Sequence, residues 1–124
     1  MKKISTQNAP AAVGPYSQAI DAGMFIFLSG QIPLDPKTSQ LVEGGVDVQT
    51  KRVIENIKAV LAAAGSDLTK VVSSTVYLAD MNDFAKMNEV YASYLIEPYP
   101  ARVTIAVKGL PKNALVEIAV VAVK

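Results

Sequence analysis

Two ionisable residues stand within the most apolar segments of the C-terminal part of the chain. Glu117 lies inside the run Leu115–Val123, and Arg102 opens a run that ends at Val107. A charge buried without a partner is costly, so each residue must be paired, lie at an edge, or be kept for a chemical task. If the two runs form a hairpin, the side chains approach each other, and an arginine can bind a carboxylate through two parallel hydrogen bonds. Two interpretations follow: a structural Arg–Glu ion pair at an interface, and a site for a carboxylate ligand.

Two glycine-containing turns carry further polar groups. Gly14-Pro15-Tyr16 places a phenol at a turn, and Ser29-Gly30-Gln31 places a hydroxyl and a flexible backbone at the end of an apolar run. Backbone N–H groups beside such a glycine can bind an oxyanion. Both tripeptides are also common in ordinary turns, so they indicate a site only together with other residues.

The residue types that are missing exclude several classes of enzyme. The chain of 124 residues contains neither Cys nor His. It therefore has no thiolate nucleophile, no disulfide, none of the usual zinc or haem ligand sets and no Ser-His-Asp triad. Acid–base chemistry must come from Asp, Glu, Lys, Tyr or water.

The charge pattern indicates neither nucleic-acid nor membrane binding. Twelve Lys and Arg against eleven Asp and Glu leave a net charge of +1, and neither sign forms a block. The polar segment Ile4–Asn8 follows the basic start where a signal peptide needs apolar residues, and no apolar run is long enough to span a bilayer. We therefore expect a cytoplasmic protein without a nucleic-acid partner.

Turn residues and hydrophobic spacing predict the first half of the fold. A polar N-terminal arm precedes a hairpin of Tyr16–Asp21 with Met24–Leu28, and prolines and glycines mark Ile32–Gly45 as an exposed loop. Apolar residues at helical spacing then predict a helix that starts at Asp47 and ends at Gly65.

The second half is predicted as a strand, a helix and two strands. Val71–Leu78 is rich in Val and Thr, and Asn82 caps a second helix that Pro98 and Pro100 stop. Within that helix, the side chains that share one face indicate core packing more than ligand contact; they are Phe84, Met87 and Tyr91. Strands over Arg102–Val107 and Leu115–Val123 end the chain.

The element order β-β-α-β-α-β-β predicts a single α+β domain over residues 1–124, with two helices on one face of a mixed sheet. The run Leu115–Val123 is apolar on both pleat faces, whereas a half-solvated strand would alternate. The chain is 51% hydrophobic and 19% charged, which leaves more apolar surface than so short a chain hides alone. We expect another subunit to cover the helix-free face and ligands to bind in clefts between subunits.

Several motifs occur in a fixed order over essentially the whole chain. They are Gly14-Pro15-Tyr16-Ser17-Gln18-Ala19, Ser29-Gly30-Gln31-Ile32-Pro33, Asn56-Ile57-Lys58-Ala59-Val60-Leu61, Pro100-Ala101-Arg102, and Leu110-Pro111-Lys112 through Val116-Glu117-Ile118. Together they resemble the RidA/YjgF family of enamine/imine deaminases. The most specific part is Pro-Ala-Arg followed at a fixed distance by Val-Glu-Ile, which contains Arg102 and Glu117.

The resemblance implies a homotrimer with a chorismate-mutase-like α+β fold, in which three sheets enclose a central barrel and a ligand cleft lies at each subunit interface. It also implies hydrolysis of 2-aminoacrylate or 2-aminocrotonate, released by pyridoxal-phosphate-dependent dehydratases, to pyruvate or 2-oxobutyrate plus ammonia. Such proteins use no cofactor and no metal, and their partner is a small carboxylate substrate.

The resemblance further implies roles for individual residues. Arg102 is expected to bind the substrate carboxylate with help from backbone N–H groups at Gly30 and Thr104. Glu117 is expected to hold and polarise the water that attacks C2 of the imine. Tyr16 is expected to act as a third catalytic residue by hydrogen-bonding near the reacting centre. The remaining pocket residues implied by the resemblance are Ser29, Phe84 and Asn88.

One position departs from the common family pattern. Many members have Cys two residues after the arginine, and this chain has Thr104. Its β-branch can narrow the pocket and its hydroxyl adds a donor, so the substrate preference stays open. The pKa of Glu117 is also open, because an apolar strand raises it and a nearby Arg102 lowers it.

Other functions compete with the deaminase. A non-catalytic metabolite-sensing or regulatory protein on the same scaffold is the main alternative, because one fold hosts many functions. Chorismate mutase proper would need several converging cations, and the chain has only Arg102 and Arg52 as arginines. Endoribonuclease activity gains no support from the charge pattern or from a histidine acid–base pair.

Overall fold

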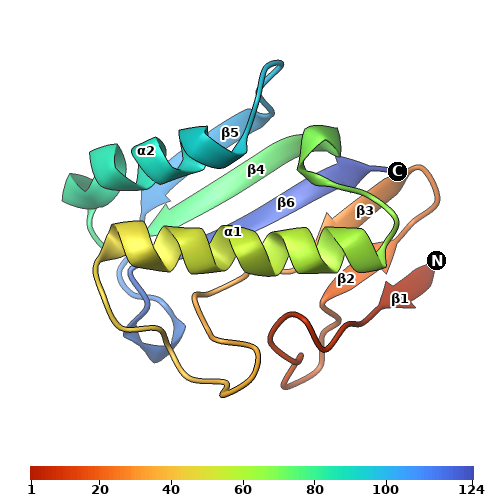
Figure 1. Cartoon of the computed structure of the whole chain (residues 1–124), viewed down its shortest axis with the longest axis horizontal. Coiled ribbons are helices and arrows are strands. Elements are labelled where there is room, and N and C mark those ends of the chain that lie inside the picture. Colours follow the sequence, from red (N-terminus) through yellow and green to blue (C-terminus); the bar gives the residue numbers. More distant parts are fainter.

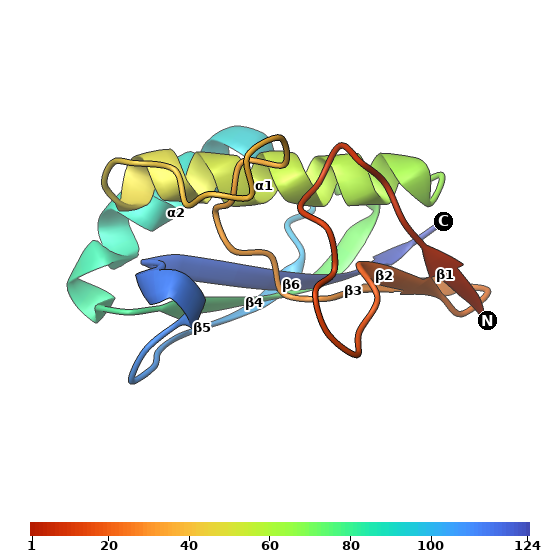
Figure 2. The same cartoon turned by 90° about the horizontal axis from the view of Figure 1, so that it is seen from below.

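The computed structural model describes residues 1–124 and contains one six-stranded sheet whose strand order is β1-β2-β3-β6-β4-β5. Two helices cover one face of the sheet, and Figure 2 shows the other face without a helix. The strands are β1 (Lys2–Ile4), β2 (Ala19–Asp21), β3 (Phe25–Leu28), β4 (Val71–Leu78), β5 (Ala101–Ala106) and β6 (Val116–Val123). The helices are α1 (Val46–Ala63) and α2 (Phe84–Tyr94), which lie side by side in Figure 1. The α+β class with both helices on one face is confirmed.

Helix α1 forms where the sequence predicts it, because its apolar residues recur on one face. Its buried side chains include Val53, Ile57 and Leu61, which pack in a core cluster of 21 buried residues. The helix ends just before Gly65, whose φ of 77° is a left-handed conformation that glycine adopts easily.

The predicted cap of the second helix is wrong. Asn82 lies inside a short 3₁₀ turn, η2 (Met81–Asp83), and the side chain of Asp80 accepts a hydrogen bond from the Asn82 N–H at 2.9 Å. Asp and Asn are equally good cap residues, and Asp80 precedes Asn82 in the chain, so Asp80 caps the turn. Helix α2 therefore starts at Phe84, and it ends at Tyr94, before the prolines reach it.

The N-terminal segment contains a strand that the sequence does not predict. Strand β1 pairs antiparallel with β2, with Lys3 opposite Ile20. It is an edge strand of three residues that carries two lysines, so it lacks the alternation that marks a longer strand. The predicted hairpin is confirmed in shorter form, as β2 pairs antiparallel with β3.

The last two strands do not form the hairpin that the sequence analysis considered. Strand β4 lies between them, parallel to β5 and antiparallel to β6. The crossover through α2 places β5 beside β4, as βαβ connections do, and β6 then fills the gap between β3 and β4. The route by which Arg102 and Glu117 were expected to meet within one chain is therefore absent.

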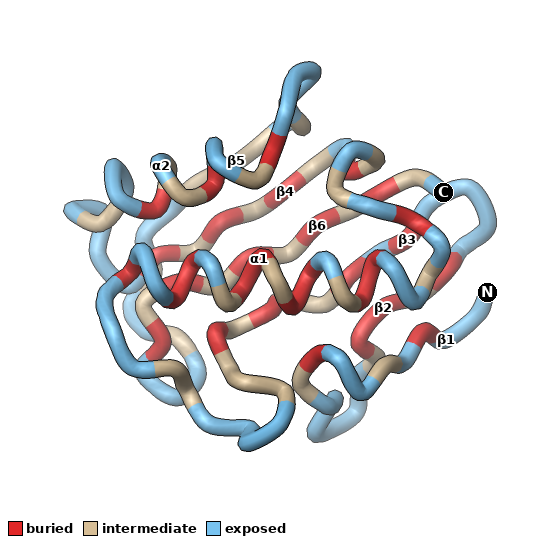
Figure 3. Tube along the Cα trace, in the orientation of Figure 1, coloured by how far each residue is buried: buried red, intermediate tan, exposed pale blue.

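The two faces of the sheet differ in what covers them. On β6, Val116, Ile118, Val120 and Ala122 are buried beneath the helices, and the residues between them are half-buried, an alternation visible in Figure 3. The helix-free face instead exposes apolar side chains, which include Phe27 at 49%, Val103 at 55% and Ile105 at 42%. The uncovered apolar face expected from the sequence is present. No helix combines the length and the apolar character needed to cross a membrane.

Candidate active site

Glu117 lies on the helix-free side of β6, opposite Tyr77 of β4. It lines an open pocket of about 640 Å³ together with three other residues predicted for the site, Tyr16, Ser29 and Gly30. We call these four residues and the cavity the Glu117 pocket. The structure thus brings together half of the predicted site residues.

Gly30 is in tight contact with Glu117. A Cβ atom on Gly30 would collide with Oε2 of Glu117 and lie 2.9 Å from its Cδ. The next residue fixes this approach, since the Gln31 N–H donates to the Ile118 carbonyl at 2.8 Å and the Ile118 N–H donates back at 3.1 Å. The Gly30 N–H donates to no backbone carbonyl of the chain, so it is free for a ligand beside the carboxylate.

Ser29 and Tyr16 form another wall of the pocket. The Ser29 hydroxyl donates to the Ser17 carbonyl at 2.5 Å, and the Ser29 N–H donates to the Gln18 carbonyl at 3.0 Å. Tyr16 is about half exposed, and its hydroxyl accepts a 3.4 Å hydrogen bond from the Val13 N–H. The Ser29 hydroxyl therefore holds two segments together, while the Tyr16 ring faces open space.

The Glu117 carboxylate has no cation within ion-pairing distance, because the ion pairs of the chain involve other residues. Burial raises its pKa above the ordinary value of 4.5. No lowering by Arg102 opposes this, since the two residues lie on different faces of the sheet. Within one chain, burial therefore decides the direction of the pKa shift.

Arg102 belongs to a second cluster, on the side of β5 that faces α2. Its Nη1 donates to Oδ1 of Asn88 at 2.8 Å, and its Cζ lies 4.7 Å from the centre of the Tyr91 ring and 5.6 Å from that of Phe84. Aromatic faces attract a guanidinium without consuming its hydrogen-bond donors. No carboxylate pairs with Arg102, so the structural Arg–Glu ion pair is not present in the chain.

Thr104 completes this cluster, because it lies two residues after Arg102 on the same face of β5. Its Oγ1 is buried and has no hydrogen-bond partner. We call Arg102, Thr104, Asn88 and Phe84 the Arg102 edge, after the edge strand that carries it.

The two groups are well separated within one chain. Arg102 is opposite Ser74 and Glu117 is opposite Tyr77, so the two lie on opposite faces of the sheet, two strands apart. Strand geometry places their Cα atoms about 14 Å from each other. One chain therefore keeps the guanidinium of Arg102 and the carboxylate of Glu117 in two separate places.

Three residues at these sites were not predicted as site residues. Lys112 lines the Glu117 pocket from a loop in which its φ is 56°, a left-handed conformation that costs a residue with a Cβ free energy. Tyr91, predicted as core, is buried and also holds Arg102 against its ring. The side chain of Gln18 is hydrogen-bonded to the backbone of Thr6 and Pro10 in the N-terminal segment. Lys112 and Gln18 stand within quoted motifs, but nothing in their spacing indicates these contacts.

The chemistry open to these groups is limited and specific. The chain has no cluster of three or more acidic, His or Cys side chains that could hold a metal ion. The Glu117 pocket offers a carboxylate of raised pKa, which suits proton transfer and water activation. It also offers a free backbone N–H, which suits an anionic oxygen. The Arg102 edge offers a guanidinium fork that suits a carboxylate.

Comparisons with known proteins find relatives over nearly the whole chain. Residues 6–124 match the family model described as Endoribonuclease L-PSP. The chain is 60% identical over 121 residues to a RutC family protein of Pyrococcus horikoshii, covering 98% of this chain and 96% of that protein. It is 49% identical over 123 residues to the Mus musculus protein named 2-iminobutanoate/2-iminopropanoate deaminase, covering 99% and 91%. The structure of E. coli TdcF with bound serine matches it with a TM-score of 0.94 at 40% identity, covering 100% of this chain and 99% of that one.

Proposed function

The chain belongs to the Endoribonuclease L-PSP family, which is the RidA/YjgF family that its motifs resemble, and we propose that it is a hydrolytic deaminase of reactive enamines and imines. The proposed substrates are 2-aminoacrylate and 2-aminocrotonate, and the products are the 2-oxoacids pyruvate and 2-oxobutyrate plus ammonia. The name of the mouse relative supports this class of reaction. We also propose that the protein works in the cytoplasm.

The observation that carries the proposal is the complementarity of the two groups. Glu117 is a half-buried carboxylate without a cation, and Arg102 is a guanidinium without a carboxylate. Leaving both charges unpaired costs free energy. A ligand would use both residues if its carboxylate bound Arg102 and its reactive carbon lay beside a water held by Glu117. The serine bound by TdcF is a small ligand that carries a carboxylate.

We propose that the complete site forms between two subunits of a homotrimer, with the Arg102 edge of one subunit facing the Glu117 pocket of the next. The separation of the two groups within one chain supports this arrangement, because a substrate of a few atoms cannot span about 14 Å. The exposed apolar side chains of the helix-free face, such as Val103 and Phe27, support burial of that face inside the assembly.

In the proposed mechanism, Arg102 binds the substrate carboxylate and so fixes C2 near Glu117. Backbone N–H groups of Gly30 and Thr104 assist, and Asn88 and Phe84 hold the guanidinium in place. A proton from the solvent adds to C3 of the enamine and gives the iminium ion. Water held by Glu117 then attacks C2 and gives up a proton to the carboxylate, which passes it to the amino nitrogen. The C–N bond breaks, ammonia leaves, and the C2 hydroxyl returns its proton to the solvent as the carbonyl forms.

The raised pKa of Glu117 suits this task. A raised pKa makes the carboxylate a stronger base, so it accepts a proton from the attacking water more readily. Tyr16 and Ser29 complete the pocket in this proposal, and the chain needs neither a cofactor nor a metal for the reaction.

The test couples this protein to a pyridoxal-phosphate-dependent threonine dehydratase and follows 2-oxobutyrate formation. Wild type should accelerate the second step, and Arg102→Ala and Glu117→Gln should abolish the acceleration with unchanged oligomeric size. The exposed residues Lys51 and Glu43 provide matched controls, since Lys51→Ala and Glu43→Gln remove equivalent charges away from both groups. Binding of a carboxylate ligand without any turnover by wild type would instead indicate the metabolite-sensing function.

A further inference from the structure

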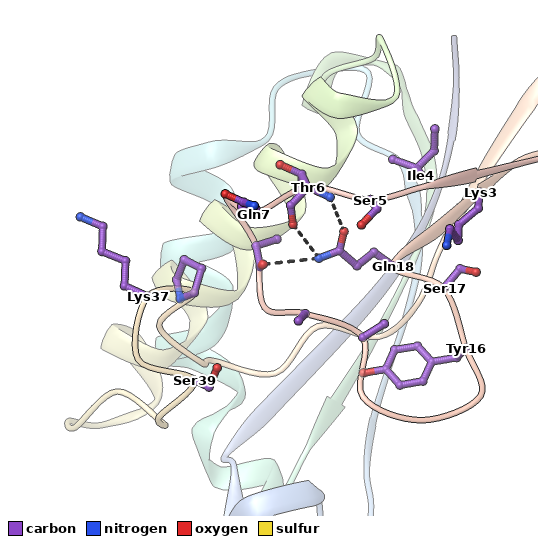
Figure 4. Close-up of a pocket in the computed structure, with 14 residues that line it drawn as sticks. Lys3, Ile4, Ser5, Thr6, Gln7, Tyr16, Ser17, Gln18, Lys37 and Ser39 are labelled. Atoms are coloured by element: carbon purple, nitrogen blue, oxygen red, sulfur yellow. Dashed lines mark hydrogen bonds between the residues drawn. The ribbon is translucent and has the colours of Figure 1, made fainter.

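Gln18 is a buried amide that uses both ends of its side chain. It is 3% exposed, and its Oε1 accepts a hydrogen bond from the Thr6 N–H at 2.7 Å. Its Nε2 donates to the carbonyls of Pro10 at 2.7 Å and Thr6 at 3.1 Å, with a longer contact to Ala9 at 3.4 Å. Figure 4 shows this amide reaching from the start of β2 to the chain that follows β1.

The segment that Gln18 holds has few other attachments. Residues 5–13, which we call the arm, make no backbone–backbone hydrogen bond. Within the arm only Ala9 is buried, and residues 11–13 are exposed. The amide of Gln18 therefore supplies most of the polar contacts that fix the arm to the body of the protein.

The arm is also part of the candidate active site. Pro10, Ala11 and Val13 line the Glu117 pocket, and Ala11 and Tyr16 also line a neighbouring cavity of about 930 Å³. The arm thus separates the pocket from a large open cavity whose only charged side chains are Lys3 and Lys37. A displaced arm would join the two spaces and remove one wall of the pocket.

The main chain at Gln18 is connected to the pocket independently of its side chain. Its carbonyl accepts the Ser29 N–H at 3.0 Å, and this contact survives truncation of the side chain. Gly30 and Glu117 are fixed by the backbone pair between Gln31 and Ile118, which does not involve Gln18. Loss of the amide should therefore move the arm and leave the carboxylate in place.

We propose that Gln18 is a positioning residue that fixes the arm as the substrate-binding wall of the Glu117 pocket. This inference rests on the proposed function, because the wall acts on a ligand held beside Glu117. It assigns the arm to substrate binding and leaves the chemical step to Glu117.

The test compares Gln18→Ala with Ser66→Ala. Ser66 is a matched control, because its buried hydroxyl donates to the Val123 carbonyl at 2.6 Å, in contact with neither the arm nor the pocket. Both variants lose a buried bond from a side chain to a backbone carbonyl, so both should lower the melting temperature. Gln18→Ala alone should raise KM about tenfold with kcat within about twofold, since a lost wall weakens ground-state binding.

Two further measurements make the result decisive. Hydrogen exchange at the Thr6 amide, whose N–H donates to Oε1 of Gln18, should accelerate in Gln18→Ala and stay slow in Ser66→Ala, with β6 protected in both. Gln18→Glu should resemble Gln18→Ala in KM, because an ionised carboxylate cannot donate to the Pro10 and Thr6 carbonyls.

The proposal is overturned if Gln18→Ala lowers the melting temperature but leaves KM unchanged, or if exchange at the Thr6 amide does not increase. Wild-type turnover is measured first, and its absence refutes the proposed deaminase function. In that case the exchange comparison still decides whether Gln18 fixes the arm, so the two failures are distinguishable.

Discussion

The Glu117 pocket and the Arg102 edge are built in different ways. In the pocket, backbone sets the geometry: the Gln31–Ile118 pair brings Gly30 against the carboxylate so closely that no side chain fits. At the Arg102 edge, side chains set the geometry: an amide and two aromatic rings of α2 hold the guanidinium on the outermost strand. One region is a partly buried acid without a cation, and the other is a cation without an acid.

This difference indicates how one small chain can carry a two-part site. The acid lies on the face without helices and the cation lies under α2, so neither neutralises the other within the chain. In the proposed function both charges remain available to a ligand, and a shared ligand and a second subunit would offset the cost to folding. The following predictions test whether the two regions have these separate roles.

The largest expected effect is that of Glu117→Gln. Activity should fall by about 10²-fold or more, because the neutral amide cannot accept the proton of the attacking water. The melting temperature should stay equal or rise at neutral pH, since burial raises the pKa of Glu117 and its ionised form opposes folding. Loss of activity together with loss of stability would contradict this account.

The same pKa shift fixes a pH dependence with a definite sign. The contribution of Glu117 to stability is fully present below its ordinary pKa of 4.5 and is lost as pH rises through the raised value. The melting temperature of Glu117→Gln should therefore exceed that of wild type more at pH 8 than at pH 4. A difference that is constant or reversed across this range would show that burial does not raise the pKa of Glu117.

Gly30→Ala should have the next largest effect. The new methyl group must displace the carboxylate end of Glu117, so kcat should fall about tenfold to a hundredfold with a small change in folding. Gly109→Ala is a matched control, because a Cβ there meets nothing within 4 Å. An active Gly30→Ala would mean that the close contact has no role in orienting Glu117.

Asn88→Ala tests the other region. Without the 2.8 Å bond to Nη1 the guanidinium keeps its aromatic contacts but loses its orientation, so KM should rise about tenfold with a smaller change in kcat. Asn82→Ala provides an exposed control before the same helix. If Asn88→Ala lowers kcat and leaves KM unchanged, Arg102 takes part in the chemical step and not in binding.

The smallest expected effect is that of Thr104→Val. The Thr104 hydroxyl is buried without a partner, so its removal should stabilise the fold by about 1 kcal/mol and change kcat/KM by less than about twofold. Thr50→Val removes the other unpartnered hydroxyl, on α1, and should give a similar rise in melting temperature. A large loss of activity in Thr104→Val alone would assign its hydroxyl to the substrate.

The local sequence pattern predicts where helices and strands lie more reliably than it predicts which strands lie side by side. The sequence predicts Val71–Leu78 to the residue from its Val and Thr content, and α1 to within two residues from its clear hydrophobic period. Strand β1 was missed, since three residues at an edge carry no period. The order of β5, β4 and β6 depends on the crossover through α2, which a comparison of adjacent segments does not contain.

For the candidate site, too, the sequence indicates individual residues but not which of them lie together. The motifs indicated Arg102 and Glu117, but only the three-dimensional structure separates them onto opposite faces. The contact between Gly30 and Glu117 joins residues far apart in the sequence, and the bonds of Gln18 follow from where the arm folds. Long-range packing decides these features, so residue type and spacing alone cannot indicate them.

The central claim is that each active site combines the Arg102 edge of one subunit with the Glu117 pocket of another. The most direct measurement is deaminase activity after co-expression of Arg102→Ala and Glu117→Gln chains, each inactive when expressed alone. In a ring of subunits with random mixing, about a quarter of the sites receive an intact arginine and an intact glutamate from adjacent chains. We predict recovery of about that fraction of wild-type activity. Mixed oligomers that remain inactive would contradict a site shared between subunits.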